Sequence, residues 1–206
     1  MKTIVYVDGF NLYYGALKGT PYKWLDVAKL CQNMLPGHDI THIKYFTAHV
    51  TSRPNDPQLG MRQQIYLRAL RTLPYFDIYL GHFLSNTCML PLANPPAGGP
   101  KFVKVIRTEE KGSDVNLATH LVADAFFGHL ECSVLITNDS DLLTPMLVAK
   151  DLGFRAGIIN PCKQRSRQLE KNADFVYDIT PAHLRQSQFP LTLTDAKGTI
   201  RKPTDW

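Results

Sequence analysis

The chain has 206 residues, of which 44% are hydrophobic and 20% charged, with a formal net charge of +5 at pH 7. These values are typical of a soluble globular protein with a single large core. No apolar run approaches the roughly 20 residues that cross a bilayer, and the first residues lack the pattern of a secretion signal. We therefore expect a cytoplasmic protein without a membrane partner. The moderate positive charge allows a polyanionic partner but does not require one.

The first part of the chain alternates between strand-like and helix-like segments. Short β-rich runs predict strands, and apolar residues at helical spacing predict helices. The strands are expected at residues 3–7, 40–50 and 76–84, and the helices at 10–17, 27–35 and 58–73. Asp26 is placed to cap the second helix. The third helix is expected to bury Met61 and to expose Arg62 and Arg68.

The middle of the chain differs in composition. Residues 90–100 are rich in Pro, Gly and Ala, which predicts an irregular surface loop. Residues 101–107 then alternate Lys and apolar side chains. This alternation indicates an edge strand or hairpin arm with a basic face.

The rest of the chain returns to alternation. Helices are expected at 114–127, 142–152 and 165–171, strands at 131–137, 154–159 and 175–179, and a last helical turn from Thr180 and Pro181. Such an order predicts an α/β fold in which helices cover both faces of a mainly parallel sheet. We expect one domain over residues 1–185 and a polar C-terminal tail over 186–206 that packs on the domain.

The cysteines indicate no metal or disulfide framework. They are far apart in the sequence and form no Cys-x-x-Cys motif, so a zinc site is not expected. We expect reduced, mostly buried thiols. They are Cys31, Cys88, Cys132 and Cys162.

Acidic residues stand where the chain leaves its predicted strands. Asp8 directly follows the first strand, Asp139 and Asp141 follow the strand at 131–137, and Asp114 opens a helix. The carboxyl ends of parallel strands form the ligand crevice of an open α/β sheet. Carboxylates gathered there repel one another unless a cation lies between them. The alternative is that each acid caps the following helix, which suits Asp114 and Asp141 one at a time.

The sequence favours a metal site, because a helix cap needs one acid and the pattern supplies four. Oxygen ligands without His or Cys select Mg²⁺ or Mn²⁺, which leave room for waters and phosphate oxygens. Such ions support hydrolysis of phosphate esters. Asn11, one helical turn after Asp8, could hold a water or a phosphate oxygen, or form an ordinary hydrogen bond at the helix start.

Three motifs occur in order along the chain: YVDGFNLY at residues 6–13, EKGSDVNLA at 110–118 and ITNDSDL at 136–142. Together they resemble the NYN domain, the LabA-like branch of the PIN-like ribonucleases, over roughly residues 3–180. The resemblance implies a Rossmann-like PIN fold, a Mg²⁺- or Mn²⁺-dependent nuclease activity, and RNA as substrate. It implies catalytic and metal-binding roles for Asp8, Asp114, Asp139 and Asp141, with Asn11 as the accompanying catalytic residue.

The chain departs from the family pattern at one position. Many members carry a further acid two turns into the helix after the KGxD sequence, where this chain has His120. Asp124 lies one turn further along nearly the same face. Either Asp124 replaces the missing acid as a metal ligand, or His120 contacts substrate, or neither matters.

Cations and aromatic residues flank the acids. Phosphate contacts are expected from Lys104, Arg107 and Lys111, which lead into Asp114, and from Arg165 and Arg167, on the opposite rim. Bases could stack on aromatic side chains, although core packing is the favoured explanation for most of them. The aromatic candidates are Tyr13, Tyr14, Phe46 and Phe102.

These features predict a metal-dependent endoribonuclease acting on single-stranded RNA with little sequence specificity. A non-catalytic RNA-binding or regulatory module, and a phosphohydrolase for small molecules, are the alternatives. A homo-oligomer or a regulatory protein partner is compatible with the sequence.

Overall fold

The computed structural model describes residues 1–52, 54–204 and 206. Within these residues, a seven-stranded sheet has the order β4-β3-β2-β1-β5-β6-β7. Neighbouring strands are parallel except β3 and β4, which are antiparallel. The strands are β1 (Lys2–Asp8), β2 (Asp39–Ala48), β3 (Phe76–Pro91), β4 (Phe102–Lys111), β5 (Cys132–Ile136), β6 (Arg155–Asn160) and β7 (Phe175–Asp178), with β8 (Thr192–Asp195) and β9 (Gly198–Arg201) forming a separate hairpin.

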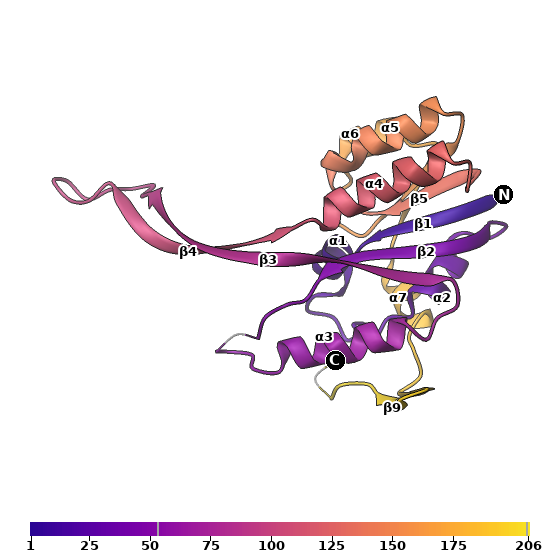
Figure 1. The fold of residues 1–206 in the computed structure, drawn as a ribbon, viewed down its shortest axis with the longest axis horizontal. Helices are drawn as coiled ribbons and strands as arrows, with labels where there is room; N and C mark the ends of the chain where they lie inside the picture. Colours follow the sequence, from indigo (N-terminus) through magenta and orange to yellow (C-terminus); the bar gives the residue numbers. More distant parts are fainter. Residues whose placement is uncertain (53, 205) are drawn as a thin grey trace.

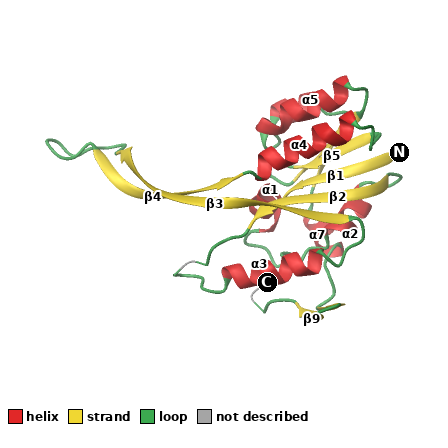
Figure 2. Cartoon of the chain, in the orientation of Figure 1, coloured by secondary structure: helices red, strands yellow, loops and turns green. Residues whose placement is uncertain are grey.

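Helices lie on both faces of the sheet (Figure 1). Helices α4, α5 and α6 cover one face, and α1, α2, α3 and α7 the other (Figure 2). The helices are α1 (Gly9–Leu12), α2 (Val27–Met34), α3 (Leu59–Leu70), α4 (Ser113–Phe126), α5 (Leu143–Asp151), α6 (Arg167–Asn172) and α7 (Pro181–Gln186), with a π-helical turn η1 (Tyr13–Leu17) and a 3₁₀ turn η2 (Ser140–Leu142). The predicted α/β fold with a mainly parallel sheet is confirmed.

The central strands are buried on both faces because helices pack against each. In β1, Val5 and Val7 face one core, while Ile4 and Tyr6 face the other. Strand β5 is buried along its whole length. This explains why both strands are continuous apolar runs and do not alternate. From β1 the chain adds β2, β3 and β4 on one side, and β5, β6 and β7 on the other side. The strand order therefore switches between β1 and β5. The carboxyl ends of these two strands flank the crevice where ligands bind in such folds.

Several local predictions hold, and two that concern α3 fail. Asp26 caps α2 by accepting a hydrogen bond from the backbone of Lys29 at 2.9 Å. The predicted helix at 10–17 begins as α1 and continues as the π-helical turn η1. The predictions that Met61 lies in the core and that Arg62 is exposed are wrong, because Met61 is 53% exposed and the Arg62 side chain is only 11% exposed. The face of α3 that packs on the sheet carries Tyr66, Leu67 and Leu70 instead.

The C-terminal residues contact the body of the protein. Phe189 and Ile200 are buried in the same core as Trp24. The indole nitrogen of Trp24 donates a hydrogen bond to the carbonyl of Pro190 at 2.8 Å, and Trp206 packs edge-on against Tyr66. A domain boundary near residue 185 stays a prediction.

The cysteines are free thiols. Two of them, Cys31 and Cys132, are buried, whereas Cys88 and Cys162 are half-buried. Among the described residues, none of the helices combines the length and apolar character that crossing a membrane requires.

Strands β3 and β4 extend further than predicted and form an arm. The pairing of β3 with β2 ends at Gly81, and residues 82–91 pair only with residues 102–111 of β4. This two-stranded segment, which we call the β-arm, projects away from the body (Figure 1). The predicted hairpin arm is present, but the prediction of a basic face on it is wrong. Strand residues alternate between faces, so Lys104 and Arg107, three positions apart, point to opposite sides.

Candidate active site

Asp8 is fixed at the carboxyl end of β1. It caps α1, with Oδ1 accepting a hydrogen bond from the backbone N–H of Asn11 at 2.8 Å. The residue is only 5% exposed. Gly9 is required next to it, because a Cβ there would lie 2.8 Å from both the carbonyl oxygen of Phe46 and the ring of Tyr45. A carboxylate is thus held in a nearly closed position at the sheet crevice.

Thr137 links Asp8 to Asp139. The Thr137 hydroxyl donates to Oδ2 of Asp8 at 3.1 Å and accepts from the backbone N–H of Asp139, also at 3.1 Å. Asp139 in turn caps η2 through a hydrogen bond from the backbone of Asp141 at 3.0 Å. The capping residue is therefore Asp139, and the side chain of Asp141 is exposed. Sequence reasoning missed Thr137, although it stands directly after a buried strand and within the motif ITNDSDL.

Asp114 lies in the first turn of α4 with an exposed side chain. It does not cap the helix. Gly112 occupies the N-cap position with a left-handed φ of 98°, which favours glycine. The orphan N–H of Ser113 donates to Oε1 of Glu110 at 3.1 Å, and the Ser113 hydroxyl to Oε2 at 2.7 Å. Because Glu110 satisfies the helix start, Asp114 is left available to the crevice.

The acids act on one another electrostatically. Burial raises the pKa of Asp8 to about 6, and the negative charges of Asp114 and Asp139 add to the effect. Burial also raises the pKa of Asp114, with further contributions from Asp139, Glu110 and Asp141. Asp8, Asp114 and Asp139 therefore lie within electrostatic range of one another, and Asp141 lies within range of Asp114. Among the described residues, no lysine or arginine is a main influence on the pKa of Asp8 or on that of Asp114.

The donor chemistry of this cluster fits a hard cation. Its ligands are carboxylate oxygens whose ionised forms repel one another, and a divalent ion would relieve that repulsion. Within residues 1–52, 54–204 and 206, however, no three His, Cys, Asp or Glu side chains stand close enough together to form a ready ion-binding group. Ion binding would therefore require these carboxylates to come closer together than they lie in this structure.

Asn11 has a positioning role in the structure. Its side-chain oxygen accepts a hydrogen bond from the backbone N–H of Asn138 at 3.0 Å. Asn138 in turn bonds the loop before α6, accepting from the backbone of Ser166 at 2.6 Å. Asn11 thereby ties α1 to the loop that carries Asp139.

Asp124 and His120 lie apart from this cluster. Asp124 is ten positions after Asp114 on α4, a rise of roughly 15 Å. Its Oδ2 accepts hydrogen bonds from Lys44 Nζ at 2.7 Å and from the Tyr6 hydroxyl at 2.6 Å. His120 packs between aromatic rings, with centroids 4.0 Å from Tyr79 and 5.7 Å from Phe46. These contacts favour structural roles for both residues over metal or substrate binding.

The predicted phosphate-binding cations are dispersed. Lys104 and Arg107 lie on the β-arm, and Arg107 pairs with Glu109. Lys111, at the base of the arm, also contacts Glu109, at 3.2 Å.

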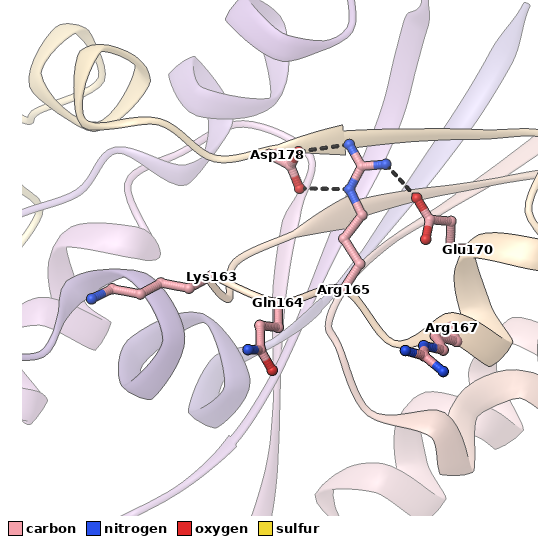
Figure 3. Close-up of a pocket in the computed structure, with 6 residues that line it drawn as sticks. All are labelled: Lys163, Gln164, Arg165, Arg167, Glu170 and Asp178. Atoms are coloured by element: carbon pink, nitrogen blue, oxygen red, sulfur yellow. Dashed lines mark hydrogen bonds and ion pairs between the residues drawn. The ribbon is translucent and has the colours of Figure 1, made fainter.

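On the opposite rim, a cavity of about 560 Å³ is lined by Lys163, Gln164, Arg165, Arg167, Glu170 and Asp178. Figure 3 shows that Arg165 points across it to two acids. Arg165 donates to both carboxylate oxygens of Asp178, at 2.9 and 2.6 Å, and to Glu170 at 2.6 Å. Arg165 is thus already paired, which leaves Arg167 as the better placed of the two to meet a phosphate.

The aromatic candidates separate by burial. Phe46 is 1% exposed and belongs to a core, and Tyr13 packs against the other. Tyr14 is 55% exposed. It lines a second cavity, of about 330 Å³, with Phe10, Asn11, Gly15 and Cys162. This cavity borders the acid cluster through Asn11. Tyr14 is therefore the aromatic residue best placed to contact a substrate ring.

Replacing Thr137 by valine tests the link between Asp8 and Asp139. The change keeps the shape but removes the hydroxyl, leaving one buried acceptor and one backbone donor unsatisfied. We expect a loss of about 1–3 kcal/mol in the free energy of unfolding, measured by urea denaturation. Thr144→Val, at an exposed position of α5, is the control and should change stability little. Equal stability of both variants would contradict the role assigned to Thr137.

Comparisons with known proteins show the family and the fold of the chain. The family model of the NYN domain matches residues 2–180. A curated relative from Pseudomonas putida, named 6-hydroxy-3-succinoylpyridine 3-monooxygenase HspA, is 31% identical over 240 aligned residues that span 100% of this chain and 75% of the relative. A crystal structure of a protein of unknown function from Vibrio parahaemolyticus shares the fold. It has a TM-score of 0.58 and 16% identity, and the match covers 91% of this chain and 96% of that one.

The family match includes all three motifs and the two strands whose ends carry Asp8 and Asp139. The match covers most of the chain, and it gives the family independently of the Pseudomonas putida relative. The protein is a member of the NYN domain family, whose domains are nuclease-like.

Proposed function

We propose that the protein is a metal-dependent endoribonuclease that hydrolyses phosphodiester bonds in single-stranded RNA. The observation that carries the proposal is the buried carboxylate of Asp8, whose pKa is raised to about 6 by burial and by Asp114 and Asp139. An acid kept in such a place is costly unless a cation joins it. Family membership supports the same assignment.

Each residue has a distinct part in the proposed reaction. Asp8, Asp114, Asp139 and Asp141 would hold Mg²⁺ or Mn²⁺, which in such sites neutralises charge on the phosphate and makes a water more acidic. Thr137 and Asn11 orient this set, because they join Asp8 and α1 to the loop that follows β5. Arg167 and Lys163, on the rim of the cavity in Figure 3, would attract the RNA backbone. Such contacts carry no base information, so little sequence preference is expected.

The test is RNA cleavage in the presence of Mn²⁺. We expect the wild type to cleave a single-stranded RNA, and Asp8→Asn and Asp139→Asn to reduce the rate by at least about a hundredfold. Asp151→Asn, at an exposed position in the last turn of α5, is the matched control and should retain activity. A circular RNA substrate distinguishes endonucleolytic from exonucleolytic cleavage, because it has no ends.

Two outcomes would argue against the nuclease assignment. Equal cleavage by the wild type and both acid variants would point to a contaminant. Tight RNA binding without turnover in Mg²⁺ or Mn²⁺ would favour a non-catalytic RNA-binding or regulatory module.

A second candidate function comes from the Pseudomonas putida relative, whose name is that of a monooxygenase acting on a substituted pyridine. The 330 Å³ cavity beside the acids is lined by Phe10 and Tyr14 and could accept a small aromatic ring. Incubating the protein with that pyridine, O₂ and a nicotinamide reductant tests this candidate. Formation of a hydroxylated product by the wild type, without RNA cleavage, would replace the nuclease proposal.

A further inference from the structure

The two cavities beside the acid cluster are connected by one loop. The smaller cavity, of about 330 Å³, is lined by Phe10 and Tyr14 and includes Cys162. The larger cavity, of about 560 Å³, includes the next residue in the chain, Lys163. Consecutive Cα atoms are about 3.8 Å apart. An aromatic cavity and a cavity with cations therefore adjoin along residues 161–166, which we call the rim loop.

The rim loop is held in place by side chains from the strand ends. The Asn160 amide donates to the carbonyl of Cys162 at 2.7 Å, and the Asn160 oxygen accepts from the Cys162 N–H at 3.1 Å. Asn138 donates to the carbonyl of Gln164 at 3.0 Å and accepts from the backbone N–H of Ser166 at 2.6 Å. The loop is thus ordered before a ligand binds, which lowers the entropy cost of binding.

The aromatic cavity is also built before a ligand binds. Tyr14 belongs to the π-helical turn η1, in which the N–H of Lys18 donates to the carbonyl of Tyr13 at 2.7 Å. Such turns occur frequently at functional sites. The turn packs closely on the rim loop, because a Cβ at Gly15 would lie 2.8 Å from Sγ of Cys162. Tyr14 is nevertheless 55% exposed, with the Tyr13 ring edge-on at 5.2 Å. A supported and exposed ring of this kind is a surface on which a base can stack.

Cations without an acidic partner surround the two cavities. Lys163 and Arg167 line the larger one, and Nζ of Lys18 lies 4.8 Å from the centre of the Tyr14 ring. None of these three cations forms an ion pair within the described part of the chain. Both acids of the larger cavity are taken up by Arg165, and Figure 3 shows no dashed line to Lys163 or Arg167. These charges are available to phosphate groups.

We propose that the two cavities form one nucleotide subsite for an unpaired stretch of RNA. A base stacks on Tyr14, and the phosphates beside it contact Lys163 and Arg167. The assignment rests on the proposed nuclease function, because it takes RNA as the strand that passes the acids. Asn11 lines the aromatic cavity and binds the backbone next to Asp139, so the bound nucleotide adjoins the proposed cleavage position.

The subsite selects single strands and not a sequence. A base in a duplex is paired and stacked on its neighbours, so it cannot turn its face to the Tyr14 ring. Stacking on an aromatic side chain tolerates every base, because each base has a π-face. A strand of RNA uses both cavities, whereas a molecule with a single ring fills only the smaller one and leaves the cations of the larger one unused.

Binding of a short labelled RNA without divalent ions tests the stacking contact. Fluorescence anisotropy compares a single strand, the same strand with abasic nucleotides, and its duplex. We expect the wild type to bind the single strand at least about fivefold more tightly than either of the others. Tyr14→Ala should remove the preference over the abasic strand, and Tyr14→Phe should retain it. Tyr75→Ala, at a 72% exposed tyrosine before β3, is the matched control and should resemble the wild type.

The salt dependence of binding tests the phosphate contacts. The logarithm of the affinity falls with the logarithm of the salt concentration, by about 0.7 for each phosphate that a protein neutralises on a single strand. Lys163→Ala and Arg167→Ala should each reduce the slope by about this amount. Lys171→Ala, exposed in the last turn of α6, is the control and should keep the slope of the wild type. Circular dichroism establishes that all variants are folded.

Three results would overturn the subsite. They are equal affinity for the normal and abasic strands, a Tyr14→Ala variant that binds as tightly as the wild type, and a wild type that binds the substituted pyridine but no RNA. The nuclease assignment fails separately, because binding is measured without cleavage. Binding that depends on Tyr14, without turnover in Mg²⁺ or Mn²⁺, would leave the subsite standing and refute the nuclease. Cleavage together with binding that does not depend on Tyr14 would refute the subsite alone.

Discussion

Asp8→Asn is expected to make the protein more stable at pH 7 while removing the proposed RNA cleavage. The folded protein holds the pKa of Asp8 at about 6, above the usual 3.8, first through burial and then through Asp114 and Asp139. Between these pH values the unfolded chain has lost the proton and the folded chain has kept it. Stability therefore falls as pH rises through this window, and the full cost is present above about pH 6.

The size of the effect follows from the shift. About two pKa units correspond to about 3 kcal/mol, which is an upper limit because local rearrangement lowers the cost. Asparagine carries no charge and keeps an acceptor for the backbone N–H of Asn11. The variant should thus be more stable than the wild type at pH 7, and the two should converge below pH 3.8.

Urea denaturation at several pH values without divalent ions measures this difference. A parallel thermal-unfolding series with Mn²⁺ should raise the melting temperature of the wild type and leave that of Asp8→Asn nearly unchanged. Asp151→Asn again serves as the control and should follow the wild type. A variant less stable than the wild type at pH 7 would show that the Asp8 carboxylate is not strained by its neighbours.

Lys44→Met is expected to be among the most destabilising single substitutions in the chain. Lys44 Nζ and Oδ2 of Asp124 lie 2.7 Å apart, with side chains only 11% and 9% exposed. Burial alone raises the pKa of Asp124, but the hydrogen bonds from Lys44 and Tyr6 outweigh it, so the pKa lies below its usual value. Removing Lys44 leaves a buried carboxylate without its counter-ion, which costs about 3–5 kcal/mol.

The contribution of the Lys44–Asp124 pair to stability depends on pH. In the wild type the pair contributes stability above the usual Asp pKa of 3.8, and that contribution is lost as pH falls through the lower folded pKa. In Lys44→Met, burial is left as the main influence and the carboxyl takes up a proton more readily. Its deficit relative to the wild type should therefore shrink as pH decreases.

The double variant Lys44→Met/Asp124→Leu is the informative control. Replacing both charges by apolar groups of similar size removes the desolvation cost as well as the attraction, but it leaves the buried Tyr6 hydroxyl without its acceptor. The double variant should therefore lose only about 1–3 kcal/mol, less than Lys44→Met alone. Urea denaturation of the two single variants and the double variant completes the cycle. A single Lys44→Met variant as stable as the wild type would mean that the pair is not closed off from water in solution.

Local chemistry makes much of the fold predictable. Buried strands such as β1 and β5 are continuous apolar runs, and Asp26 and Thr180 stand at real helix starts. Helix and strand signals depend on neighbours within a few residues, which the sequence displays directly. For the same reason the residue pattern alone places Asp8 and Asp139 at strand ends.

Predictions that depend on distant partners are less secure. Met61 has the right spacing for the core, but the face that α3 buries is set by the sheet beneath it. Arg165 resembles a free cation until the fold brings Asp178 beside it. The predicted length of β3 is too short because its outer half pairs with β4 alone, across a loop rich in proline and glycine.

The sequence by itself determined the α/β alternation, the acids at the strand ends and the motifs of the NYN family, because each is a local pattern of residue types. Only the tertiary structure decided that Thr137 joins Asp8 to Asp139, and that Asp124 pairs with Lys44. These are contacts between residues up to 129 positions apart in the chain. They form only when the order of strands in the sheet brings β1 beside β5 and places α4 across both.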